Sequence, residues 1–195
     1  MYQSENSSSQ LAKHYAELVI DKVKLGYTCH LLTFHFPKLP ISKRALMPAM
    51  KDQLERVYAT FSTRVTRRPK STSPDKLPIL IGAFDLPVYK KGKATAPDAM
   101  FNGGLHFQGL MLVPRHSRLR QSVTDHFSQY NNLYTGSGQL IQTIDVRPVV
   151  DGHRRLVDYL FKTIKAGKIS LDEGLVILPR ARSEMTGWTP SAVAA

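Results

Sequence analysis

The chain has 195 residues, of which 42% are hydrophobic, so it can bury a core of its own and is not disordered as a whole. It carries 27 lysine and arginine residues against 15 acidic ones, a formal net charge of +12. A surface this basic makes nucleic acid the first partner to consider, although a solubility charge or an acidic protein partner would fit the same balance.

The single cysteine, Cys29, excludes an intramolecular disulfide and a cysteine-rich zinc site. No apolar run approaches the roughly 20 residues that a bilayer requires. The opening stretch MYQSENSSSQ lacks the charged and apolar regions of a signal peptide. We therefore expect a protein of the cytoplasm that does not enter a membrane.

The first part of the chain alternates helical and extended patterns. Residues 1–9 are polar and rich in serine and are expected to form a flexible tail. Apolar residues at three- and four-residue steps predict helices over 10–25 and 42–66. Between them, residues 27–36 (YTCHLLTFHF) are rich in β-branched and aromatic side chains, which predicts a strand. Residues 67–76 form a basic loop rich in proline and serine.

The middle of the chain predicts a hairpin followed by a helix and a strand. Residues 77–89 and 104–114 are expected to be strands, joined by the long loop that begins at Lys90. Helical periodicity follows over 117–134. The segment 137–149 (SGQLIQTIDVRPV) predicts a further strand.

The last part of the chain predicts a helix over 153–167, with Gly167 just beyond its end. Residues 170–179 fit either a helical turn or a short strand. The segment 181–195 is expected to be an irregular C-terminal tail. Since no linker divides 10–180, we expect a single α+β domain there, with a mostly antiparallel central sheet of four to five strands packed by helices.

The strand at 104–114 carries two polar residues on one face. His106 and Gln108 are two residues apart, so their side chains share a face, with Phe107 on the other. An imidazole nitrogen and an amide oxygen are both acceptable ligands for Mg²⁺ or Mn²⁺. The pair therefore predicts part of a metal site, although a hydrogen-bonded polar pair on a solvated sheet would have the same spacing.

A carboxylate would complete such a metal site. Asp85 lies on the strand that the hairpin pairs with His106, and we prefer it because a strand holds a ligand more firmly than a loop. Asp98, in the loop before His106, is the alternative third ligand. His35 is a further polar group nearby, but its face of the sheet stays open at this stage.

The predicted helix at 153–167 carries Tyr159 and Lys162 three residues apart, on one helical face that Lys165 continues. An ammonium fixed beside a phenol favours the phenolate or holds a phosphate next to a nucleophile. The same spacing is common on amphipathic helices, where it reflects packing and a solvated charge.

Taken together, these segments resemble the HUH endonucleases, the family of rolling-circle replication initiators, conjugative relaxases and single-tyrosine transposases. The resemblance covers about residues 27–167. It rests on three motifs in the family's order: Leu31-Leu32-Thr33-Phe34, His106-Phe107-Gln108 and Tyr159-x-x-Lys162. Gln108 stands where most of the family has a second histidine, as in the circovirus initiators, which remain metal-dependent nucleases.

The resemblance implies a Rep-like fold, a relative of the ferredoxin-like fold, and cleavage of single-stranded DNA by Tyr159. The products would be a 5′-phosphotyrosine link and a free 3′-OH, which can later be rejoined. His106, Gln108 and Asp85 would hold a Mg²⁺ or Mn²⁺ ion, and Lys162 would position the phosphate or offset its charge. The first expectation is initiation of plasmid or phage replication, with transposition and conjugative transfer as alternatives.

The sequence contains no P-loop, so the substrate must already be single-stranded or a host helicase must unwind it. The basic residues expected to follow the DNA backbone are Arg67, Arg68, Lys90, Lys91, Arg115, Arg118, Arg154, Arg155 and Lys165. A DNA- or RNA-binding protein that keeps this fold without catalysis is the rival interpretation.

Overall fold

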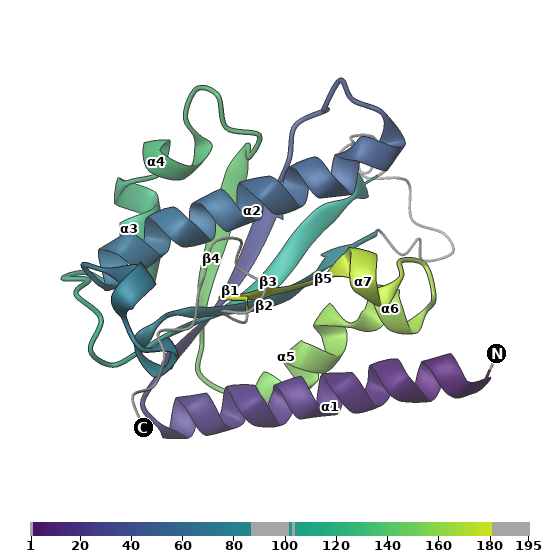
Figure 1. Ribbon diagram of the computed structural model, residues 1–195, viewed down its shortest axis with the longest axis horizontal. Coiled ribbons are helices and arrows are strands. Elements are labelled where there is room, and N and C mark those ends of the chain that lie inside the picture. The colour runs from purple at the N-terminus through teal and green to yellow at the C-terminus, as the bar shows by residue number, and fades with distance from the viewer. Residues whose placement is uncertain (1, 87–101, 103, 181–195) are drawn as a thin grey trace, which may run out of the picture.

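A five-stranded antiparallel sheet lies between two layers of helices in the computed structural model (Figure 1), which describes residues 2–86, 102 and 104–180. The strands follow the order β4-β1-β3-β2-β5 across the sheet. Their bounds are β1 Thr28–His35, β2 Ile79–Asp85, β3 His106–Val113, β4 Thr143–Val149 and β5 Leu175–Leu178. The predicted α+β class and the antiparallel sheet are thereby confirmed.

The helices divide between the two faces of the sheet (Figure 1). One layer contains α2, α3 and α4, and the other contains α1, α5 and α6. The bounds are α1 Tyr2–Lys24, α2 Lys43–Val65, α3 Val123–Gln129, α4 Asn132–Thr135, α5 His153–Leu160, α6 Lys162–Lys165 and α7 Leu171–Gly174. Two short 3₁₀ turns, η1 Pro69–Ser71 and η2 Pro74–Lys76, lie in the predicted loop between α2 and β2.

Several predicted boundaries were wrong, among them the strand expected over 137–149, which begins only at Thr143. Residues 2–9 belong to α1 rather than to a tail, because each residue added to a helix that already exists gains a hydrogen bond. The helix expected over 117–134 begins only at Val123, since the Ser122 side chain accepts a hydrogen bond from the Asp125 amide and caps it there. The helix expected over 153–167 is interrupted at Phe161.

The undecided segment 170–179 contains both alternatives, the helical turn α7 followed by strand β5. The expected C-terminal tail at 181–195 lies outside the described residues. So do Lys90, Lys91 and Asp98.

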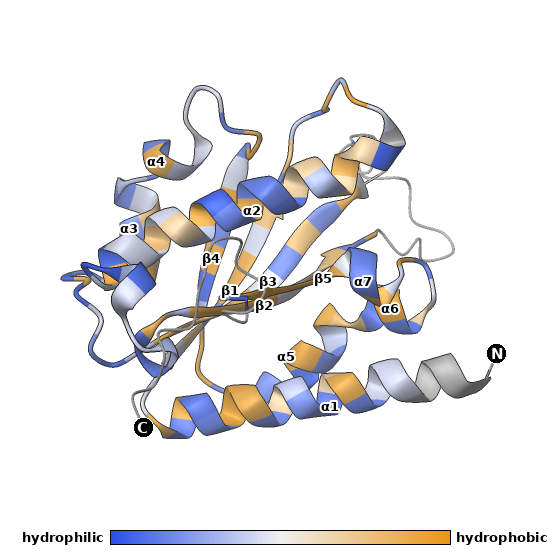
Figure 2. Ribbon diagram, in the orientation of Figure 1, coloured by the Kyte–Doolittle hydropathy of each residue, from blue (hydrophilic) through white to orange (hydrophobic). Residues whose placement is uncertain are grey.

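The larger part of the core lies between the sheet and α2. Phe107 on β3 packs edge-on against Phe34 and Phe84, with ring centroids 5.6 and 5.4 Å apart. The hydropathy colouring shows apolar residues along the middle of the sheet and apolar residues alternating with polar ones on α1 and α2 (Figure 2). A methyl group at Gly82 would come within 2.5 Å of the Phe107 ring and 2.4 Å of the Gln108 carbonyl oxygen. Gly82 is therefore required because the Phe107 ring occupies the space that a side chain would take.

Candidate active site

The strand register lines up a row of polar residues on the other face of the sheet. Asp85 on β2 is directly opposite His106 on β3, so the two side chains share a face. On the other side of β3, Thr33 of β1 is opposite Gln108, which puts His35 on that face too. The imidazole rings of His35 and His106 are stacked, with centroids 6.3 Å apart and planes inclined by 11°. The face of His35, open from the sequence, is thus the face of the predicted metal ligands.

The extent to which helices α5 and α6 cover β3 explains why this strand has the polar residues His106 and Gln108 near its start. His106 and Gln108 are half-buried, whereas Gly109–Val113 are all buried. The apolar residues of α5 and α6 pack on the part of the face that contains Leu110. The polar side chains lie beyond this cover, at the end of the sheet where β3 begins.

Tyr159 and Lys162 meet this row at Asp85. The ammonium of Lys162 donates a hydrogen bond to the Tyr159 hydroxyl, with 2.6 Å between Nζ and the phenol oxygen. The same Nζ lies 2.7 Å from Oδ2 of Asp85. Tyr159 is 47% exposed, whereas Asp85 is buried. Lys162 therefore connects an accessible phenol to a buried carboxylate that also faces His106.

The turn at Phe161 lies between Tyr159 and Lys162. Phe161 is fully buried and stacks on Tyr15 of α1, with ring centroids 6.0 Å apart. Its backbone leaves the helical conformation, so Tyr159 lies in the last turn of α5, which ends at Leu160, while Lys162 begins α6. The packing of Phe161 against Tyr15 thus fixes the turn that connects the two candidate residues, Tyr159 and Lys162.

Three groups lie around the carboxylate of Asp85. The buried hydroxyl of Thr163 donates to Oδ1, and Oδ2 faces both Lys162 and Nε2 of His106, the latter at 3.5 Å. Burial alone would lower the pKa of Lys162, but its hydrogen bonds to Asp85 and Tyr159 outweigh burial and raise that pKa. Lys162 is therefore an ammonium at neutral pH. Sequence reasoning missed Thr163, because nothing in the local pattern marks its contact with β2.

The residues in this row fit a divalent ion in the kind of ligand they offer. Asp85 and Gln108 supply oxygen, His35 and His106 supply imidazole nitrogen, and these suit Mg²⁺ or Mn²⁺. Nδ1 of His106 lies 3.1 Å from the carbonyl oxygen of Gly104, which leaves Nε2 directed at Asp85. Within the described residues, no three side chains of His, Cys, Asp or Glu already converge as a metal cage.

The predicted DNA-binding residues fall into separate groups. Four of them lie where β3 ends and β2 begins, one strand length or about 20 Å from His106 and Asp85: Arg67, Arg68, Arg115 and Arg118. The amide of Arg118 donates to the carbonyl oxygen of Val65 there. These charges lie at the opposite end of the sheet from Tyr159 and could contact only a distant part of a bound strand.

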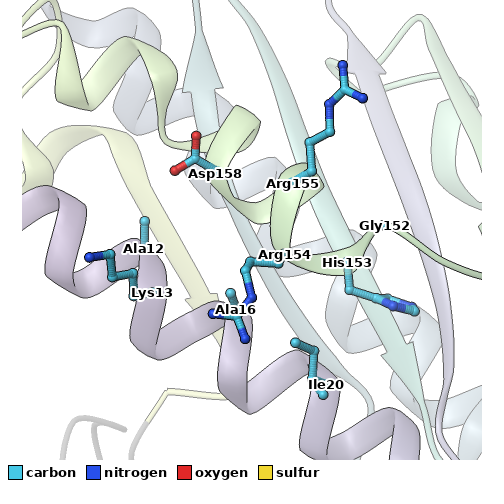
Figure 3. A pocket seen from close by; sticks show the side chains of 9 residues that line it. All are labelled: Ala12, Lys13, Ala16, Ile20, Gly152, His153, Arg154, Arg155 and Asp158. Carbon is cyan, nitrogen blue, oxygen red and sulfur yellow. The ribbon is translucent and has the colours of Figure 1, made fainter.

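Of the other predicted DNA-binding residues, the described ones, Arg154, Arg155 and Lys165, lie on α5 and α6, the helices that carry Tyr159 and Lys162. Arg154 pairs with Glu17 of α1 at 2.6 Å, and Lys165 pairs with Asp158. Arg154 and Arg155 line a hollow of about 660 Å³ between α1 and the start of α5 (Figure 3). Arg155 is one helical turn from Tyr159 and so lies on the same side of α5.

No protein-family model, curated protein or solved structure matches the chain. Among the described residues, none of the helices combines the length and the apolar character required to cross a membrane.

Proposed function

We propose that the protein is a metal-dependent endonuclease and strand transferase of the HUH type that nicks and rejoins single-stranded DNA. The observation that carries the proposal is the hydrogen bond between the exposed Tyr159 phenol and the Lys162 ammonium, beside Asp85 and His106. His106, Tyr159 and Lys162 belong to the motifs on which the family resemblance rests, and Asp85 lies opposite His106 on the neighbouring strand. A surface phenol with no such partners would give much weaker support.

In the proposed reaction the phenol oxygen of Tyr159 attacks the scissile phosphorus. The bond from phosphorus to the 3′ oxygen breaks, and the DNA downstream of the cut stays attached through a 5′-phosphotyrosine. Lys162 is already protonated, so the phenol proton passes to solvent, and the leaving 3′ oxygen takes a proton from solvent. Attack of a 3′-OH on the phosphotyrosine reverses these steps and rejoins the strand.

Lys162 stabilises the negative charge that develops on the phenol oxygen and on the phosphate next to it. In the structure the ammonium lies beside Asp85, whose other carboxylate oxygen accepts a hydrogen bond from Thr163. A Mg²⁺ or Mn²⁺ ion held by His106, Gln108 and Asp85 would act as a Lewis acid on the scissile phosphate. His35 is a further candidate ligand, because it shares the face of His106.

The process we propose is initiation of rolling-circle replication of a plasmid or phage, in the cytoplasm and with a host helicase. Transposition and conjugative transfer by an enzyme of the same family are alternatives. The net charge of +12 supports contact with a DNA backbone in each case.

The test is a nicking assay on a randomised pool of single-stranded DNA. The pool is labelled at its 3′ end and incubated with Mn²⁺ or with EDTA, and the products are separated on a denaturing protein gel. We expect a labelled protein band that requires Mn²⁺ and is absent in Tyr159→Phe. Tyr130→Phe is the matched control, since Tyr130 is similarly exposed and belongs to no motif, and it should keep the band. A band that persists in Tyr159→Phe would refute the assigned nucleophile.

A non-catalytic nucleic-acid-binding protein is the second candidate. It is favoured by the contact of Lys162 with the Asp85 oxygen and by the glutamine at position 108. This candidate predicts binding to the same pool without a covalent band in any metal. Competition by RNA of the same sequences would then distinguish RNA binding from DNA binding.

A further inference from the structure

Oδ2 of Asp85 faces two groups at once. It lies 2.7 Å from the Lys162 ammonium and 3.5 Å from Nε2 of His106. Thr163 donates to the other carboxylate oxygen, and the side chain of Asp85 is only 5% exposed. The lysine is therefore bound to the same oxygen that a cation between Asp85 and His106 would need.

A divalent ion and the ammonium cannot share this oxygen at bonding distance. A Mg²⁺ ion bonds oxygen at about 2.0–2.1 Å, so it would lie close to Nζ beside a carboxylate that is only 5% exposed. Lys162 can move away from Asp85, because its side chain is 28% exposed and its ammonium has Tyr159 as a second hydrogen-bond partner. Asp85 is held by the hydrogen bond from Thr163 and by the pairing of its backbone with β3 at the end of β2, so it is less free to move than Lys162.

We propose that Lys162 and a divalent cation compete for Oδ2 of Asp85, and that cation binding releases the ammonium to the Tyr159 phenol and the attached phosphate. This inference rests on the proposed function for the identity of the cation. Before the cation binds, the carboxylate neutralises much of the lysine charge. After it binds, that charge is available at the nucleophile, so activation of Tyr159 is coupled to occupation of the metal site.

The experiment measures Mn²⁺ binding by isothermal titration calorimetry. Lys162→Met removes the competing charge and keeps the length of the side chain. We expect it to bind Mn²⁺ more tightly than the wild type by on the order of tenfold, because a charge-assisted hydrogen bond no longer has to be broken. Lys168→Met is the matched control, since it removes one exposed charge nearby and should change the affinity by less than about twofold. Asp85→Asn should abolish most of the binding.

Unchanged or weaker Mn²⁺ binding in Lys162→Met would overturn the competition, and so would the absence of Mn²⁺ binding in both proteins. Circular dichroism checks the fold of each variant, and Lys162→Gln replaces the methionine variant if that one does not fold. The covalent-band assay is read separately. If the band forms but Lys162→Met binds Mn²⁺ like the wild type, only the competition fails. If affinity rises but no band ever forms, the nuclease proposal fails and the competition stands.

Discussion

The ion pair between Lys162 and Asp85 should contribute far more to stability than an exposed pair of the same length. The sheet supplies the comparison, because Arg147 and Asp145 on β4 also form an ion pair. The N···O distances are 2.7 Å for Lys162–Asp85 and 2.8 Å for Arg147–Asp145. The exposed side-chain fractions are 28% and 5% in the first pair, against 74% and 47% in the second. Burial is therefore the main difference between them.

Losing one partner of a fully buried pair costs about 3–5 kcal/mol, whereas an exposed pair contributes about 0.2–1 kcal/mol. Lys162 keeps some contact with water, so we expect a coupling energy of about 2 kcal/mol with Asp85. For Arg147 and Asp145 we expect less than about 0.5 kcal/mol.

The assay is urea unfolding followed by circular dichroism, for a double-mutant cycle on each pair. One cycle uses Lys162→Met with Asp85→Asn, and the other uses Arg147→Met with Asp145→Asn. The asparagine at 85 retains an oxygen that can accept the hydrogen bond from Thr163. Equal coupling energies in the two cycles would refute the reasoning that the buried carboxylate holds Lys162 in place.

Three further results are expected. Gly82→Ala should lower the free energy of unfolding by about 3 kcal/mol, because the new methyl group collides with the Gln108 carbonyl oxygen, which cannot move aside. Gly109→Ala should lower it by only about 1 kcal/mol, because its methyl group mainly contacts side chains that can move. Equal urea midpoints for the two variants would contradict this. Burial lowers the pKa of His30 from 6.5, so the unfolded chain takes up a proton first and stability falls as the pH drops below 6.5. His30→Gln should lose less stability than the wild type between pH 6.5 and about 5, and an equal loss would show that His30 does not contribute. Thr163→Val should lower the free energy of unfolding by about 1–2 kcal/mol in the same assay, because Asp85 loses a buried hydrogen bond. An unchanged urea midpoint would show that Thr163 does not stabilise Asp85.

The parts of the site that depend on local pattern were predictable from the sequence. The two-residue period of a strand puts His106 and Gln108 on one face, and the hairpin brings Asp85 opposite His106. The three-residue step of a helix brings Tyr159 and Lys162 together even though the helix breaks between them.

The remaining features depend on contacts between distant segments. The stacking of His35 on His106 requires the register between β1 and β3, which no turn in the sequence specifies. The contact of Thr163 with Asp85 requires the docking of α6 on β2. The break at Phe161 follows from its packing against α1, which outweighs a helical pattern that continues through that position.

The measurement that tests the central claim most directly is mass spectrometry of the protein–DNA adduct. The adduct is digested with nuclease and trypsin, and tryptic cleavage after Arg155 and Lys162 releases the peptide 156–162, in which Tyr159 is the only tyrosine. The account predicts a nucleotide 5′-phosphate on Tyr159 in this peptide. A nucleotide on any other residue, or cleaved DNA with no peptide adduct, would contradict it.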